Sequence, residues 1–116
     1  MGLERFYRGG LNSERMILAI TAETVSACHQ NAVRKGFWEA SDNLGEKLCL
    51  IHSEISEALE ELRKPEPSKA AIAEELADVC IRVADLAGYL EIDLLGAIDK
   101  KMIANQARPI MHGKRF

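Results

Sequence analysis

Two long stretches of the chain carry apolar residues at every third or fourth position, which is the period of an amphipathic α-helix. They span residues 43–63 and 69–90. The apolar stripe of the first consists of Leu48, Ile51, Ile55, Leu59 and Leu62, and that of the second of Ile72, Leu76, Val79, Val83 and Leu86. We expect both stripes to form the core of an all-α fold.

Capping residues and helix breakers set the expected boundaries of the elements. The predicted helices span residues 13–34, 43–63, 69–90 and 94–107. A residue suited to an N-cap stands at the start of each: Asn12 or Ser13, Ser41 or Asp42, Ser68, and Asp93. Gly9 and Gly10 break any earlier helix. The sequence therefore predicts an N-terminal arm over residues 1–12 and one four-helix-bundle-like domain over residues 13–116.

The bulk composition is that of one ordinary globular domain. The 116 residues are 47% hydrophobic and 28% charged, which argues against disorder. A net charge of −3 gives no general attraction to nucleic acid, and no apolar run reaches the ~20 residues of a membrane span. Cys28, Cys49 and Cys80 are widely spaced. We expect them to be reduced thiols in or near the core of a cytoplasmic protein.

The helix predicted over residues 69–90 has a second apolar side. Ala77, Ile81 and Ala84 occupy it, opposite the core stripe. A small helix that is apolar on two sides needs a second partner surface. The pattern therefore predicts a homo-oligomer.

Two acidic pairs flank the turn between the two long helices. They are Glu54 with Glu57 and Glu75 with Asp78, and within each pair the spacing of three puts both carboxylates on one helix face. Glu66 lies midway in sequence between Glu54 and Asp78 and also between Glu57 and Glu75. In an antiparallel hairpin that turns at Glu66, each acid on one helix therefore lies opposite an acid on the other. Four carboxylates should therefore converge across helices ~8–10 Å apart.

Such a cluster resists joint ionisation unless a cation joins it, and hard oxygen ligands suit Mg²⁺ or Mn²⁺. The alternatives are a solvated acidic face and a structural network of ion pairs. In such a network Arg82 pairs with Asp78 one turn earlier on the same helix, and Lys47 pairs with nearby acids.

Two further sets of residues suit a nucleotide. Lys101, Asn105 and Arg108 share one helical face and can bind phosphate oxygens, or they can simply complement the dipole at a helix end. Trp38, the only tryptophan, can stack on a nucleobase or anchor the core. His29 is either a ligand-binding residue or an ordinary satisfied histidine of the core or surface.

Together these motifs resemble the MazG-like all-α nucleoside triphosphate pyrophosphohydrolases. The resemblance covers about residues 25 to 116, and it consists of Glu54-x-x-Glu57, the segment Glu74-Glu75-Leu76-Ala77-Asp78 and Lys101-x-x-x-Asn105-x-x-Arg108. It implies metal ligation and catalysis by the four acids, with Mg²⁺ as cofactor. It also implies that Lys101, Asn105 and Arg108 contact the phosphates and that the protein assembles as a dimer or tetramer.

One branch of this family, the deoxycytidine triphosphatases, has a base-contacting pair with the spacing of His29 and Trp38. Arg82 stands where that branch carries an aromatic residue, so the resemblance does not fix the base.

The resulting hypothesis is attack of water at the α-phosphorus of a nucleoside triphosphate, with release of pyrophosphate. Lys47, Lys101 and Arg108 would hold the departing group, and the biological role would be nucleotide-pool sanitation. The alternative is a non-catalytic helical interaction module that keeps the fold. A carboxylate-bridged di-iron bundle is disfavoured, because neither His29 nor His52 stands three residues after a suitable acid.

Overall fold

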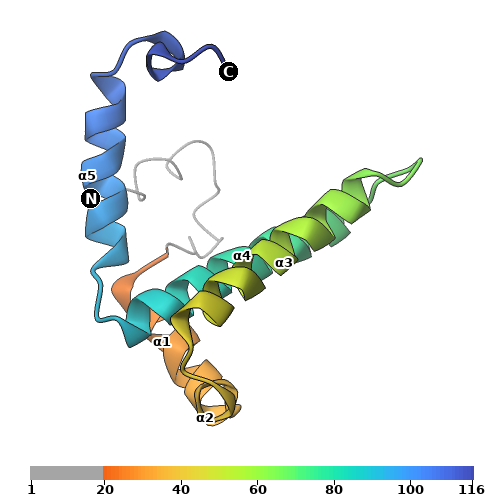
Figure 1. Ribbon diagram of the computed structural model, residues 1–116, viewed down its shortest axis with the longest axis vertical. Coiled ribbons are helices and arrows are strands. Elements are labelled where there is room, and N and C mark those ends of the chain that lie inside the picture. The colour runs from red at the N-terminus through yellow and green to blue at the C-terminus, as the bar shows by residue number, and fades with distance from the viewer. Residues whose placement is uncertain (1–19) are drawn as a thin grey trace, which may run out of the picture. The chain divides into compact units, whose positions relative to one another are not determined.

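The computed structural model describes residues 20–116, and every regular element in that range is helical, which confirms the all-α prediction (Figure 1). The elements are α1 (Ala22–Arg34), α2 (Phe37–Ala40), α3 (Leu44–Leu62), α4 (Lys69–Tyr89), α5 (Leu94–Gln106) and the 3₁₀ helix η2 (Ile110–Gly113). The predicted arm and the predicted helical residues 13–19 lie outside the described residues. Within the described range, no helix is long and apolar enough to cross a bilayer.

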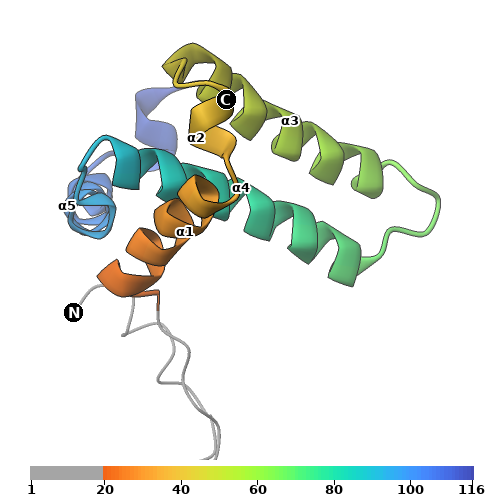
Figure 2. The ribbon, with the colours of Figure 1, turned by 90° about the horizontal axis from the view of Figure 1, so that it is seen from below.

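The chain divides into two compact units. One comprises residues 23–92, with nearly all of α1 and the whole of α2, α3 and α4, and the other contains residues 93–116 with α5 and η2. The first unit carries the acidic pairs. It is built on the antiparallel hairpin of α3 and α4, with α1 lying across the C-terminal half of α4 (Figure 2).

Side-chain caps begin three of these helices close to where the sequence places them. The Asn43 side chain accepts a hydrogen bond from the Glu46 N–H at 3.0 Å, so Asn43 caps α3 in place of Ser41 or Asp42. Ser68 and Asp93 cap α4 and α5 as predicted. Pro65 and Pro67 stand in the turn between α3 and α4, where they disfavour continuation of the helix.

The apolar stripe predicted as the core face of α3 is not buried, which corrects that prediction. Four of its members are about half exposed: Leu48 52%, Ile55 49%, Leu59 54% and Leu62 55%. The covered side of α3 instead carries Lys47, Glu54 and Ala58. Two antiparallel helices bury only one stripe of each, and here the stripe that meets α4 is the one that contains the acids.

The α4 helix is covered differently. Of its predicted core stripe only Leu76 is exposed, at 52%, and the other members are half-buried. On its second apolar side Ile81 is exposed, whereas Ala84 is buried within the chain. The buried apolar residues within residues 20–116 are all alanines: Ala32, Ala58, Ala84 and Ala87. Cys49 and Cys80 are exposed, so the expectation of buried thiols is wrong for these two, whereas Cys28 is half-buried. Small residues on the facing sides let the helices approach closely.

A glycine allows α1 to approach α4. A Cβ atom built on Gly88 would lie 2.5 Å from the Cβ of His29, which is closer than two carbon atoms can stand. This contact brings His29 within hydrogen-bonding distance of Asp85 on α4. Gly88 is therefore required by the packing of α1, although glycine inside a helix costs up to ~1 kcal/mol relative to alanine.

We expect Gly88→Ala to lower the free energy of unfolding by about 1 kcal/mol or more, because the cost of overpacking, ~1–3 kcal/mol, exceeds the gain in helix propensity. Chemical denaturation followed by the fluorescence of Trp38 measures this change. If the variant is instead more stable by the full propensity gain, α1 does not pack against Gly88.

Candidate functional site

Three carboxylates from the two long helices meet between α3 and α4. One oxygen each of Glu54, Glu57 and Glu75 lies within 4.8 Å of the others. Glu54 is buried at 8% exposure, whereas Glu57 is exposed and Glu75 is half-buried. The hairpin therefore brings together three of the four predicted acids, and we call these three the acidic triad.

Asp78, the fourth predicted acid, lies outside the acidic triad. It is exposed and lines a pocket next to the triad, together with Glu54. Asp78 follows Glu75 by one helical turn on α4, so it extends the acidic surface from the triad into this pocket.

Arg82 forms the main counter-charge of the triad. Its Nε–H donates to Glu54 Oε1 at 2.5 Å, across the two helices. The Arg82–Asp78 pair of the structural alternative therefore does not form. Arg82 pairs instead with Glu54, the buried acid on α3. A buried carboxylate without a partner is costly, which explains why the longer reach is preferred.

The acids of the triad differ in their affinity for protons. The hydrogen bond from Arg82 lowers the pKa of Glu54 below its usual value. The pKa of Glu57 is raised, first by the adjacent carboxyl of Glu54 and then by that of Glu75. Two acids at this distance cannot both ionise without repulsion. The negative charge of the triad is therefore least compensated at Glu57.

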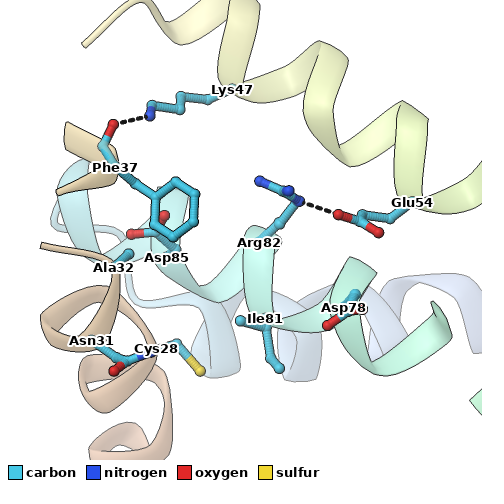
Figure 3. A pocket seen from close by; sticks show the side chains of 10 residues that line it. All are labelled: Cys28, Asn31, Ala32, Phe37, Lys47, Glu54, Asp78, Ile81, Arg82 and Asp85. Atoms are coloured by element: carbon cyan, nitrogen blue, oxygen red, sulfur yellow. Dashed lines mark hydrogen bonds and ion pairs between the residues drawn. The ribbon is translucent and has the colours of Figure 1, made fainter. Parts of the chain in front are cut away.

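The pocket beside the triad has a volume of about 280 Å³. All its lining residues lie between positions 28 and 85, on α1 to α4, and most carry polar or charged side chains (Figure 3). They are Cys28, Asn31, Ala32, Phe37, Lys47, Glu54, Asp78, Ile81, Arg82 and Asp85. Two cations and three carboxylates thus border one hollow.

Lys47 is one of these two cations and is almost fully buried, at 8% exposure. Its Nζ donates to the backbone carbonyl of Phe37 at 2.7 Å and lies 4.6 Å from the ring centroid of Trp38. The structural alternative expected Lys47 to pair with nearby acids, but it makes no ion pair with an acid in residues 20–116. An ammonium has three N–H donors, and the Phe37 carbonyl uses one of them.

His29 and Trp38 meet on a residue that the sequence did not single out. Asp85 Oδ1 lies 2.8 Å from His29 Nδ1 and accepts a hydrogen bond of the same length from Trp38 Nε1. The Asp85 carboxylate therefore ties α1 and α2 to α4. It also lines the pocket.

The ring of Trp38 is stacked on Tyr89 at the end of α4. The ring centroids are 3.9 Å apart and the planes differ by 8°. His29 meets both rings edge-on, at 5.7 Å and 6.2 Å. Trp38 does not line the pocket, and one of its faces is covered, so it has the contacts expected of an anchor for α2.

The residues predicted to contact phosphates belong to the other compact unit. Lys101 and Asn105 lie on α5, and Arg108 follows the C-cap of that helix. Both cations are exposed, whereas the Asn105 Oδ1 atom is buried without a hydrogen-bond partner in the described part of the chain. The contact of these residues with phosphates stays a prediction.

Asp85 and Tyr89 are the residues that the sequence reasoning missed. A usable signal exists, because Asp78, Arg82, Asp85 and Tyr89 follow one another on α4 at steps of four, three and four. This spacing places Asp85 on the same helix face as Asp78 and Arg82. The partners on α1 and α2 carry no comparable periodic signal.

The acidic triad fits a hard divalent cation. Three carboxylate oxygens this close provide a suitable donor set for Mg²⁺ or Mn²⁺, and a bound cation would relieve the repulsion by Glu54 and Glu75 that raises the pKa of Glu57. The chain matches no known family model, and no curated protein or solved structure is found to be similar to it.

We expect Glu57→Gln to raise the melting temperature of the protein in EDTA at neutral pH. The pKa of Glu57 is raised in the folded state, so the folded protein binds this proton more tightly than the unfolded chain. The contribution of Glu57 to stability is therefore present below its usual pKa and is lost as the pH rises through the folded-state value. The variant should melt at the same temperature as the wild type at pH 3.5 and higher at pH 7.

The same variant should respond less to Mg²⁺. A ligand bound only by the native state raises the melting temperature. We expect the variant to need at least about tenfold more Mg²⁺ than the wild type for the same rise in melting temperature. Glu60→Gln is the control, because Glu60 is an exposed acid on the same helix that pairs with Arg63. Equal Mg²⁺ responses in both variants and the wild type would rule out Glu57 as a ligand.

Proposed function

We propose that the protein hydrolyses (deoxy)nucleoside triphosphates to monophosphate and pyrophosphate with Mg²⁺, or with Mn²⁺ in its place. The observation that carries this proposal is the acidic triad beside a pocket that also contains Lys47 and Arg82. A Mg²⁺-triphosphate requires both kinds of charge, carboxylates for the ion and cations for the phosphate oxygens. The motifs that resemble the MazG-like family support the same reaction.

In this proposal the residues of the hairpin bind and orient the substrate. Glu54, Glu57 and Glu75 would hold the Mg²⁺ ion, and Asp78 lines the pocket from the adjoining turn. When bound, the ion would neutralise phosphate charge and lower the pKa of a water molecule. The N–H donors of Lys47 that the Phe37 carbonyl leaves unused would bind a phosphate oxygen. The resemblance alone assigns the departing pyrophosphate to Lys101 and Arg108.

The pocket volume of about 280 Å³ lies near the lower end of the ~300–1,000 Å³ that is usual for small-molecule sites. This agrees with a free nucleotide as substrate and with a net charge of −3, which gives no attraction to nucleic acid. A function in nucleotide-pool sanitation and a cytoplasmic location belong to the same proposal.

We expect the purified protein with Mg²⁺ and a panel of (deoxy)nucleoside triphosphates to release pyrophosphate, and Glu54→Gln and Glu75→Gln to lower kcat by about a hundredfold or more. In water enriched with ¹⁸O the label should enter the monophosphate, because attack occurs at the α-phosphorus. Label in pyrophosphate, or release of inorganic phosphate, would contradict the reaction assigned here. Glu60→Gln serves again as the control.

A homo-oligomer also belongs to the proposal. The exposed residues Leu48, Ile55, Leu59 and Leu62 form a continuous apolar stripe on α3, which a second copy would cover. We expect Leu59→Lys to reduce the mass measured by light scattering to that of the 12.9 kDa monomer, whereas the neighbouring Glu60→Lys should leave it unchanged. A monomeric wild type would contradict this part of the proposal.

One observation favours the alternative of a non-catalytic helical module. Arg82 already compensates Glu54 within the chain, and the exposed apolar stripe suits a helical partner. Such a module would show no turnover of any nucleoside triphosphate, and its melting temperature would not respond to Mg²⁺.

A further inference from the structure

Arg82 occupies the position of a cation on the acidic triad. Its Nε–H is bonded to Glu54 Oε1 at 2.5 Å, and Glu54 is the most buried member of the triad. An ion that binds Glu54 together with Glu57 and Glu75 must share this carboxylate with Arg82 or replace it. The two cations therefore compete for one anionic group.

The rest of the Arg82 guanidinium is directed elsewhere. Its terminal nitrogens lie on the side away from Glu54, within the pocket and toward Lys47 and Phe37 (Figure 3). Within residues 20–116 these nitrogens make no hydrogen bond. The side chain is 32% exposed, so it has room to rotate about its own stem.

The surroundings determine what the guanidinium would bind after leaving Glu54. Lys47 is the other cation of the pocket and retains N–H donors beyond the one on the Phe37 carbonyl. Two cationic donors that converge on one hollow form a site for an anion with several oxygens, and a guanidinium suits phosphate in particular. Asp85, the nearest acid in the next turn of α4, already accepts bonds from His29 and Trp38.

We propose that Arg82 is an internal counter-ion that holds Glu54 when no metal is bound and that transfers to a phosphate of the nucleotide when a divalent ion takes its place on Glu54. The proposal rests on the proposed function, because it assumes the metal and a phosphate substrate. It makes binding of the two ligands cooperative: the metal releases the phosphate-binding group, and the phosphate prevents that group from returning to Glu54. Arg82 is thus a positioning residue for the metal and a binding residue for the substrate.

The first experiment uses the wild-type protein and NMR. The Nε–H resonance of Arg82, assigned by its loss in Arg82→Lys, should be protected from solvent exchange in EDTA because it is bonded to Glu54. Addition of MgCl₂ alone should shift this resonance and increase its exchange rate. The proposal is overturned if the resonance is unchanged while backbone amide shifts show that Mg²⁺ is bound near the triad.

The second experiment measures both affinities by titration calorimetry. Removal of the competing cation in Arg82→Gln should make MnCl₂ bind about tenfold more tightly without nucleotide, which corresponds to ~1.4 kcal/mol. Inorganic triphosphate should bind about tenfold more weakly to the same variant at saturating MgCl₂. Arg82→Lys, which keeps the charge but loses the planar donor geometry, should lie between the variant and the wild type in both titrations.

Arg63→Gln is the matched control, because Arg63 also pairs with a glutamate of α3 but on the exposed surface. It should leave both affinities at the wild-type level. If Arg82→Gln binds MnCl₂ no more tightly than this control, Arg82 does not compete with the ion and the proposal is wrong. These binding measurements require no turnover, so a failure here is distinguishable from an absence of pyrophosphate release, which would overturn the proposed function.

Discussion

A buried carboxylate on the covered side of α3 is the constraint on which the site depends. Glu54 is buried between the two long helices, and a charge in that position needs a compensating group. Arg82 provides it across the hairpin. The same covered stripe contains Ala58, whose small side chain allows α3 and α4 to approach closely enough for acids on both helices to meet. Charge compensation and close packing are thus requirements of a single interface.

The ends of this interface differ in what they contribute. Toward the turn, Glu57 and Glu75 complete the acidic triad, which accumulates negative charge. Toward the C-terminal end of α4, Asp85 fastens α1 and α2 through His29 and Trp38 and so builds the opposite wall of the pocket. Trp38 is in turn stacked on Tyr89. The pocket therefore lies between the acidic triad and the contacts that Asp85 makes with α1 and α2.

The sequence was sufficient for the long helices and for all three acids of the triad, whereas Asp78, the fourth acid that it predicted, lies outside the triad. Helical periodicity and caps located α3, α4 and α5 within about one residue, and equal spacing from the turn brought Glu57 and Glu75 together. Periodicity does not reveal which of two adjacent stripes meets the partner helix. The leucines of α3 satisfied the apolar pattern best, yet α4 packs against the neighbouring stripe, which contains the small residue Ala58 and the partner of Arg82, Glu54.

Long-range contacts were the other feature beyond the reach of the pattern. Arg82 has an acid one turn away on its own helix, and the sequence offered that local pair as the structural alternative. The bond to Glu54 joins residues 28 positions apart and depends on the angle between two helices. The ties from Asp85 to His29 and Trp38, over 56 and 47 positions, depend likewise on the close contact at Gly88. Such contacts follow from the assembled fold and leave no periodic trace.

The central claim is that the acidic triad binds a divalent cation, and anomalous diffraction from crystals grown with MnCl₂ tests it most directly. The account predicts a manganese peak within ligand distance, ~2.2 Å, of carboxylate oxygens from both α3 and α4, with Glu54 among the ligands. The absence of an anomalous manganese peak between Glu54, Glu57 and Glu75, in well-diffracting crystals grown at manganese concentrations well above those in cells, would contradict the claim.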